Sequence, residues 1–136
     1  MVPVGLHQLI EAQARRTPGQ VAVVFEQERL TYGELDRRAD TLAHRLRTLG
    51  VGPDLLVGLF VERSLEMVVG ILGILKAGAA YVPIDAGYPP ERIAFMLADA
   101  NVSVLLTQRS LVASLPTGVA EAICLDVFDW SDSRAP

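Results

Sequence analysis

Three charged side chains follow apolar runs of the kind that form buried strands. Glu62 and Arg63 come directly after the run 55–61, and Asp85 follows the run 80–84. In α/β proteins, ligand-binding groups stand at the carboxyl ends of strands, so these positions are candidates for a site. Neither stretch supplies a partner base or an anion-binding loop. A surface ion pair or a helix-entry turn is therefore the favoured interpretation of Glu62 and Arg63, and an architectural role is favoured for Asp85.

The remaining basic candidates are two histidines and one arginine. His7 and His44 lie in stretches with helical spacing and have no nearby Cys, Asp or His at the spacing of metal ligands. We interpret both as solvated helix residues rather than as metal ligands or bases. Arg92 falls in the first turn of a helix, where the dipole disfavours a cation. We therefore expect a carboxylate or a backbone carbonyl to hold its guanidinium in a structural role.

One cysteine and three aspartates lie in the last part of the chain. Cys124 is the only cysteine, which excludes an internal disulfide and a cysteine-based metal cluster. Its apolar neighbours favour a buried, unreactive thiol over a nucleophile. Asp126, Asp129 and Asp132 could suggest a metal site, but the segment lacks the glycine and the distal glutamate of a calcium loop. A solvated polar tail over 127–136 is the favoured interpretation.

Motifs of the common catalytic classes are absent from the sequence. There is no phosphate loop of the form GxxxxGKS or GxxxxGKT, no GxGxxG, no GxSxG elbow and no Ser-x-x-Lys pair. The stretch LKAGAAYVPID (75–85) instead reads as a helix that ends at Gly78 and passes directly into a strand. We assign no catalytic, cofactor-binding or metal-binding residue from these patterns.

Helical and strand patterns alternate along the chain. Helices are predicted over 6–16, from the capping box at Thr31 to Gly50, over 65–77 behind a Ser64 cap, from about residue 90, and over 110–115. Strands are predicted over 21–26, 29–32, 55–61, 80–84, 103–107 and 122–126, the first two as a hairpin. Gly70 and Gly73 lie inside the 65–77 helix, where we expect them to let it approach the sheet closely.

The order of these elements predicts an α/β fold. Strand–helix units in succession favour a partial layered sheet with parallel strands, preceded here by a helix and a β-hairpin. In the first helix, Leu6, Leu9, Ile10 and Ala14 recur near helical spacing, which predicts an amphipathic helix. With only about four core strands, we expect one edge of the sheet to lack cover.

Composition narrows the classes of partner. The chain has 136 residues, about the length of one domain, with a formal net charge of −4. This acidic balance argues against a nucleic-acid-binding surface, which needs a basic face. The longest uncharged runs of the apolar middle of the chain, 67–75 and 77–84, are too short for a membrane span of about 20 residues. The N-terminus lacks the pattern of a secretion signal, so a cytoplasmic location is the default expectation.

Two stretches carry a resemblance to a known family. LTYGEL (30–35) resembles the first core motif of the amino-acid adenylation domains of nonribosomal peptide synthetases, and LKAGAAYVPID (75–85) resembles their second. ERSLEMVVGILGILKAG and YPPERIAFMLADA are also similar to that family, so the resemblance covers about 6–126. The chain, 1–136, is therefore interpreted as an incomplete N-terminal segment of such a domain, the first portion of the N-terminal lobe of an adenylate-forming enzyme.

The resemblance implies an activity for the complete domain. Such a domain binds ATP, Mg²⁺ and an amino acid, forms an aminoacyl-adenylate with release of pyrophosphate, and loads a phosphopantetheine carrier domain. The family's phosphate loop and its substrate-, adenine- and ribose-binding residues have no counterpart in these 136 residues. The two motifs present are interpreted as scaffold, so this chain alone is expected to hold no cofactor and not to adenylate. Its expected partners are the remainder of the domain and the carrier domain.

Two alternatives remain open at this point. The first is the front of a related adenylate-forming ligase that activates fatty or aryl acids, although LKAGAAYVPID and ERSLEMVV fit the peptide-synthetase branch better. The second is a stand-alone, noncatalytic module that docks to a synthetase partner. A module of that kind is expected to unfold in one cooperative transition, whereas a sheet with an uncovered edge is expected to associate.

Overall fold

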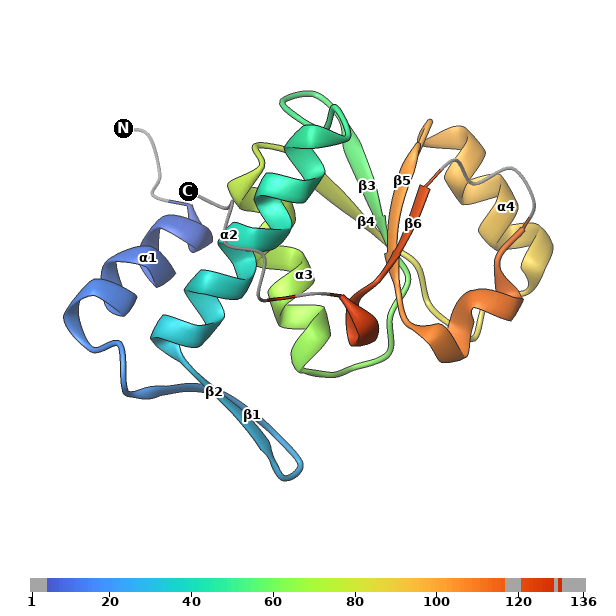
Figure 1. The fold of residues 1–136 in the computed structure, drawn as a ribbon. Coiled ribbons are helices and arrows are strands. Elements are labelled where there is room, and N and C mark those ends of the chain that lie inside the picture. The colour runs from blue at the N-terminus through green and yellow to red at the C-terminus, as the bar shows by residue number, and fades with distance from the viewer. Residues whose placement is uncertain (1–4, 117–120, 129, 131–136) are drawn as a thin grey trace.

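The computed structural model describes residues 5–116, 121–128 and 130, which form a layered α/β fold (Figure 1). In chain order its elements are α1 (Leu6–Arg16), β1 (Val21–Phe25), β2 (Glu28–Thr31), α2 (Tyr32–Thr48), β3 (Leu56–Leu59), α3 (Leu65–Lys76), β4 (Ala80–Pro83), α4 (Pro90–Asp99), β5 (Val104–Thr107), η1 (Arg109–Ser114), β6 (Glu121–Cys124) and η2 (Leu125–Val127). The predicted alternation is confirmed, with strand ends displaced by one or two residues.

The main sheet has four parallel strands in the order β4-β3-β5-β6. Leu59 of β3 aligns with Pro83 of β4 and with Leu106 of β5. β3 and β5 are buried almost throughout, as expected of apolar strands covered on both faces. β4 is an edge strand of the described sheet, and Pro83 is tolerated there because it needs no partner for an N–H. The expected uncovered edge is therefore found at β4, where three of four residues are exposed.

Helices cover both faces of this sheet (Figure 1). On one face, α2 and α3 pack on β3, β5 and β6 around Leu42, Val57 and Leu106. On the other, α4 and η1 enclose a second apolar cluster that contains Phe60, Ile93, Leu105 and Leu111. The hairpin of β1 and β2 forms a separate antiparallel pair beside α1 and α2. None of the described helices is long and apolar enough to cross a membrane.

Local sequence signals begin and end the two helices of the larger core. Thr31 Oγ1 accepts from Glu34 N at 3.1 Å, and Thr31 N donates to Glu34 Oε1 at 3.0 Å, which completes the predicted capping box of α2. Ser64 Oγ accepts from Met67 N at 3.2 Å and caps α3. Gly78, which follows α3, has a φ of +89°, the left-handed conformation that favours glycine at a helix end.

The two glycines inside α3 face different neighbours. A Cβ on Gly70 would lie 3.2 Å from side-chain carbons of Leu59 and Leu125, so this glycine does bring the helix close to the sheet. A Cβ on Gly73 would lie 2.6 Å from Leu42 Cδ2 and 3.0 Å from Leu42 Cβ. The prediction that Gly73 serves approach to the sheet is therefore wrong, because its open face receives α2 instead.

The first helix is present as predicted but does not bury its apolar positions. Only Ala14 of α1 is buried, whereas Leu6 and Leu9 are 52% and 56% exposed. The spacing thus predicted the helix correctly, but periodicity by itself does not show how far a neighbour covers the apolar face.

The C-terminal part differs from its prediction in two details. The segment predicted as a short helix over 110–115 is the 3-10 helix η1. Phe128 and Trp130, which lie in the stretch predicted as a polar tail, pack against the core with their ring centroids 4.6 Å apart. The Arg38 guanidinium lies 5.7 Å from the Trp130 ring centroid. The tail prediction did not anticipate these contacts.

Candidate functional site

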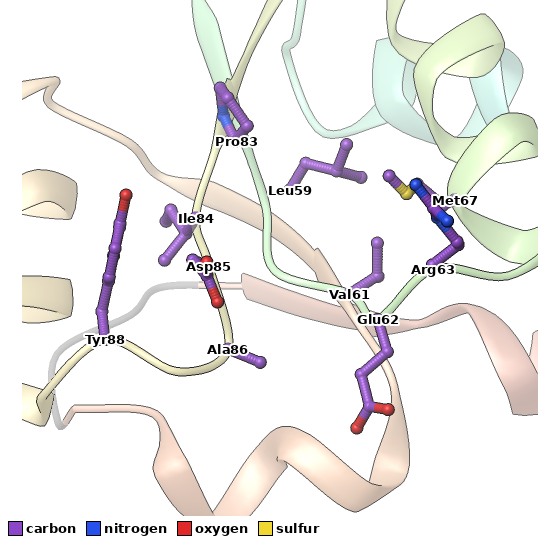
Figure 2. A pocket seen from close by; sticks show the side chains of 10 residues that line it. All are labelled: Leu59, Val61, Glu62, Arg63, Met67, Pro83, Ile84, Asp85, Ala86 and Tyr88. Carbon is purple, nitrogen blue, oxygen red and sulfur yellow. The ribbon is translucent and has the colours of Figure 1, made fainter.

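A cavity of about 450 Å³ opens where β3 and β4 end. Leu59 and Val61 line it at the end of β3, and Ile84 and Ala86 line it beyond β4. Figure 2 shows Tyr88 and Asp85 along one wall and Arg63 and Met67 along the opposite wall. The cavity lies at the carboxyl ends of parallel strands, the edge where α/β proteins place ligand sites.

All three charged residues singled out after the strands line this cavity. Glu62, Arg63 and Asp85 come together there although 22 positions separate Arg63 from Asp85 in the sequence. Their side chains are exposed, and among the described residues they form no ion pair. Asp85 Oδ1 accepts from Gly87 N at 2.8 Å, which closes a tight turn after β4. The predicted architectural role of Asp85 is supported by this hydrogen bond.

Gln108, which the sequence reasoning missed, joins the loops after β3 and β5. Its Oε1 accepts from Glu62 N at 2.9 Å, and its Nε2 donates to Ser64 Oγ at 3.3 Å. Ser64 Oγ in turn donates to Glu62 O at 2.9 Å. Glu62 and Arg63 therefore belong to a helix-entry turn held by a side chain that follows β5. An amide directly after a buried strand was the only sequence signal for this role.

Arg92 differs from its prediction. Its guanidinium carbon lies 4.2 Å from the Tyr88 ring centroid, a cation–π distance. Among the described residues it forms no ion pair. The expected carboxylate or carbonyl partner is replaced by an aromatic face, because the turn after β4 places Tyr88 just before α4 and within reach of its first turn.

The remaining candidates do not assemble into a reactive centre within the described residues. Burial, helped by the nearby Asp126 carboxylate, raises the pKa of the half-buried Cys124 thiol above its ordinary value of 9.0. The thiol is thus protonated at neutral pH and a poor nucleophile. Asp126 accepts from Arg109 N at 3.1 Å, whereas Asp129 and Asp132 lie outside the described residues.

The two histidines stay apart from these groups. His7 lies on α1 and His44 lies on α2, and both are partly buried rather than fully solvated. His7 Nδ1 is buried without a hydrogen-bond partner among the described residues. No group of three or more metal-binding side chains occurs in the part of the chain that the structure describes.

The most strongly paired charge of the described structure is Lys76, which the sequence reasoning did not single out. Its Nζ lies 2.8 Å from Glu11 Oε1, 2.8 Å from Asp36 Oδ1 and 2.8 Å from Asp40 Oδ1. The lysine side chain is 4% exposed, and the carboxylates are 24% to 35% exposed. We call these four residues the Lys76 cluster. It joins α1, α2 and α3, because Glu11 comes from the first helix and the two aspartates from the second.

Opposing effects set the protonation of this cluster. Burial by itself lowers the pKa of Lys76, but the contacts with the three carboxylates outweigh burial and raise the pKa above its ordinary value of 10.5. The hydrogen bond with Lys76 lowers the pKa of Glu11 below its ordinary value of 4.5, although burial acts in the other direction. At neutral pH Lys76 is therefore protonated and Glu11 is ionised.

The described residues thus provide a shaped cavity and the Lys76 cluster. Neither of these contains a nucleophile paired with a base. A comparison with protein families adds the deciding observation, because residues 10–135 match the family described as AMP-binding enzyme. The chain belongs to the AMP-binding enzyme family.

Curated relatives place this chain near peptide synthetases. It is 57% identical over 121 residues to a linear gramicidin synthase of Brevibacillus parabrevis, an alignment that covers 89% of this chain and 2% of that protein. It is 60% identical over 106 residues to tyrocidine synthase 3 of the same organism, covering 78% of this chain and 2% of that protein. The resemblance to adenylation domains of nonribosomal peptide synthetases is confirmed. The chain spans a small share of the length of these relatives.

Solved structures agree with the fold. The chain matches the nonribosomal peptide synthetase FmoA3 with a TM-score of 0.88 and 42% identity, over 93% of this chain and 14% of that one. It matches the N-terminal subdomain of Klebsiella oxytoca NpsA in complex with 3-hydroxybenzoyl-AMSN with a TM-score of 0.78 and 27% identity, over 89% of this chain and 30% of that one. The partial layered α/β sheet is confirmed as the N-terminal part of such domains.

Proposed function

We propose that this chain is a scaffold portion of an amino-acid adenylation domain in a nonribosomal peptide synthetase. One observation carries the proposal: the chain matches FmoA3 in its α-methyl-L-serine-AMP bound form over 97% of its length, with a TM-score of 0.88 and 40% identity. A fold shared at this identity supports a shared role in a protein that binds an aminoacyl adenylate. The chain covers 15% of that protein, so the complete activity belongs to a larger assembly.

Within that assembly, ATP, Mg²⁺ and the amino acid bind chiefly to residues outside this chain. FmoA3 has also been solved with AMPPNP, which supports ATP as the nucleotide. The 136 residues contain no glycine-rich phosphate loop, and the cavity after β3 and β4 is lined by two carboxylates, Glu62 and Asp85, and one guanidinium, Arg63. Two carboxylates outnumber the single guanidinium, so this cavity does not supply the electrostatic stabilisation of a triphosphate that phosphoryl chemistry needs. The 136-residue chain alone therefore does not adenylate.

The partners of the chain follow from the same proposal. They are the remainder of the adenylation domain and a phosphopantetheine carrier domain, and the assembly works in the cytoplasm. A fused adenylation–carrier di-domain, NpsA-ThdA, matches this chain with a TM-score of 0.78 and 28% identity, which supports the carrier partnership. No role in nucleic-acid binding is proposed, because the net charge is −4.

Amino acids are favoured over aryl acids as the substrate class. The NpsA complex with the aryl compound 3-hydroxybenzoyl-AMSN matches this chain at 27% identity, against 40% for FmoA3 with its aminoacyl adenylate. Similarity in the scaffold supports membership of the amino-acid branch. The substrate itself is chosen by residues elsewhere.

A chimera tests the proposal. The region of FmoA3 that matches this chain is replaced by residues 6–128, and exchange of pyrophosphate with ATP is measured with α-methyl-L-serine. We expect activity within about tenfold of the parent, with unchanged amino-acid preference, because a scaffold contributes no substrate contact. A folded chimera without exchange activity, or one with a new amino-acid preference, would contradict the scaffold role.

Asp85→Asn in the same chimera serves as a matched control. Asparagine keeps an oxygen that accepts from Gly87 N and removes the charge at the cavity. We expect exchange within about threefold of the unsubstituted chimera. A loss of about a hundredfold in a folded variant would give Asp85 a chemical role and overturn its assignment as architecture.

A further inference from the structure

The Lys76 cluster links α1 to the rest of the fold through charge. Lys76 lies at the end of α3 and is buried, and two of its three carboxylates, Asp36 and Asp40, come from α2. Glu11 is the cluster's contact on α1, at 2.8 Å from the ammonium. A buried ammonium needs carboxylate partners to offset its desolvation, and two of them remain if α1 moves away.

The apolar side of α1 is packed loosely. A cavity of about 280 Å³ lies among α1, β1, α2 and α3, lined on α1 by Leu6 and Ile10 and opposite by Leu35 and Val68. Empty volume beside apolar side chains removes dispersion contacts, so these residues hold the helix weakly. Leu9 is exposed, only Ala14 is buried, and Ile10 is partly buried against the core, so apolar contacts provide only part of the attachment of α1.

We propose that the Lys76 cluster is an electrostatic latch that holds α1 closed over this apolar groove, and that α1 opens as a unit while α2, α3 and the sheet stay folded. In the closed state Lys76 contacts three carboxylates; in the open state it keeps Asp36 and Asp40. Both states leave the lysine paired, which makes opening local rather than global. This inference does not rest on the proposed function.

The other charges near the Lys76 cluster act alike in the closed and the open state, because His7 and Arg15 move with Glu11 on α1. His7 and Arg15 on α1 both lower the pKa of Glu11 through charge, although less than Lys76 does. From α2, Arg47 Nη2 donates to Lys76 O at 2.9 Å and holds the end of α3 in place whether α1 is closed or open. Glu11 is thus the contact in the cluster whose loss separates α1 from the other helices.

Hydrogen exchange measured by mass spectrometry on the 136-residue chain tests the latch. Glu11→Gln removes the charge and keeps the shape of the side chain. We expect amide exchange in α1 to accelerate about tenfold, while exchange in α2 and β5 stays within about twofold of wild type. Glu91→Gln, which removes one exposed carboxylate from α4, should leave exchange in α1 unchanged.

Ile10→Ala distinguishes the latch from ordinary packing. Ile10 faces the groove, so its truncation should accelerate α1 exchange less than Glu11→Gln does, by at most about threefold. The proposal is overturned if Ile10→Ala has the larger effect, or if Glu11→Gln leaves α1 unchanged. It is also overturned if α2 and β5 lose protection together with α1 in Glu11→Gln, because opening would then be global.

Discussion

At Lys76 one ammonium group balances carboxylates from two other helices. Removing a partner from a buried charge costs more than breaking an exposed ion pair, because the remaining charge has no water to solvate it. Glu11 is one-third exposed, so its contact with Lys76 is weaker than a fully buried pair and is sensitive to pH and salt. These properties suit a contact that opens.

The latch predicts a pH dependence with a defined sign. The pKa of Glu11 in the folded chain lies below its ordinary value of 4.5, so its stabilisation is complete above about pH 4.5 and is lost as the pH falls through the lower folded value. We therefore expect protection of α1 amides, corrected for intrinsic exchange rates, to decrease as the pH falls below about 4.5 and through the lower folded pKa, before α2 loses protection.

Glu11→Gln is the control for this titration. Because the variant lacks the carboxylate, protection of its α1 amides should be lower than in the wild type at neutral pH. It should also change less over the same fall in pH. If the variant shows the same pH dependence as the wild type, another group controls the docking of α1 and the assignment to Glu11 is wrong.

At the scale of elements, α2 packs closely against α3 at Gly73. A Cβ added there would lie 2.6 Å from Leu42 Cδ2, 2.8 Å from its Cγ and 3.0 Å from its Cβ, so rotation of that side chain gives little relief. We expect Gly73→Ala to lower the free energy of unfolding by about 1–2 kcal/mol, because overpacking outweighs the gain in helix propensity. Urea unfolding monitored by circular dichroism measures this change, provided that the m-value is unchanged.

Gly70→Ala, one turn earlier in α3, provides the comparison. Its added carbon would meet only terminal methyl groups at 3.2 to 3.3 Å, which can shift by a few tenths of an ångström. We expect Gly70→Ala to lower the free energy of unfolding by less than Gly73→Ala does, or to raise it slightly. Equal losses for the two variants would show that backbone flexibility, rather than contact with Leu42, sets the effect at position 73.

At the scale of the whole molecule, β4 leaves one edge of the sheet accessible. Tyr81, which lies on this strand, is 37% exposed, and unpaired strand edges promote association between chains. We expect the 136-residue chain to show an average mass that rises with concentration in size-exclusion chromatography with light scattering. Tyr81→Lys should shift the mass toward the monomer, because a charge on an edge strand opposes edge-to-edge pairing.

Val24→Lys is the matched control for that experiment. Val24 lies on the hairpin, away from the main sheet, and is 61% exposed. The Val24→Lys substitution should therefore leave the association between chains unchanged. A wild-type chain that stays monomeric at every concentration and unfolds in one cooperative transition would contradict the prediction and favour a stand-alone docking module.

The sequence by itself determined the elements, their order and the family. The caps at Thr31 and Ser64 and the stop at Gly78 depend on atoms within a few positions along the chain, so local residue types predict them. The apolar runs predicted the buried strands for a similar reason, since a strand covered on both faces needs no polar position. The motifs at 30–35 and 75–85 added the correct family.

Only the tertiary structure decided how these elements meet. Asp36 and Asp40 are four positions apart, and their shared helix face is readable from the sequence, but the contact of Lys76 with Glu11 spans 65 positions. The cavity lined by both Arg63 and Asp85, and the contact of Gly73 with Leu42, likewise bring together residues that are distant in the sequence. Such contacts depend on the packing angles and separations of whole helices and strands, which many side chains set together and which no local pattern specifies.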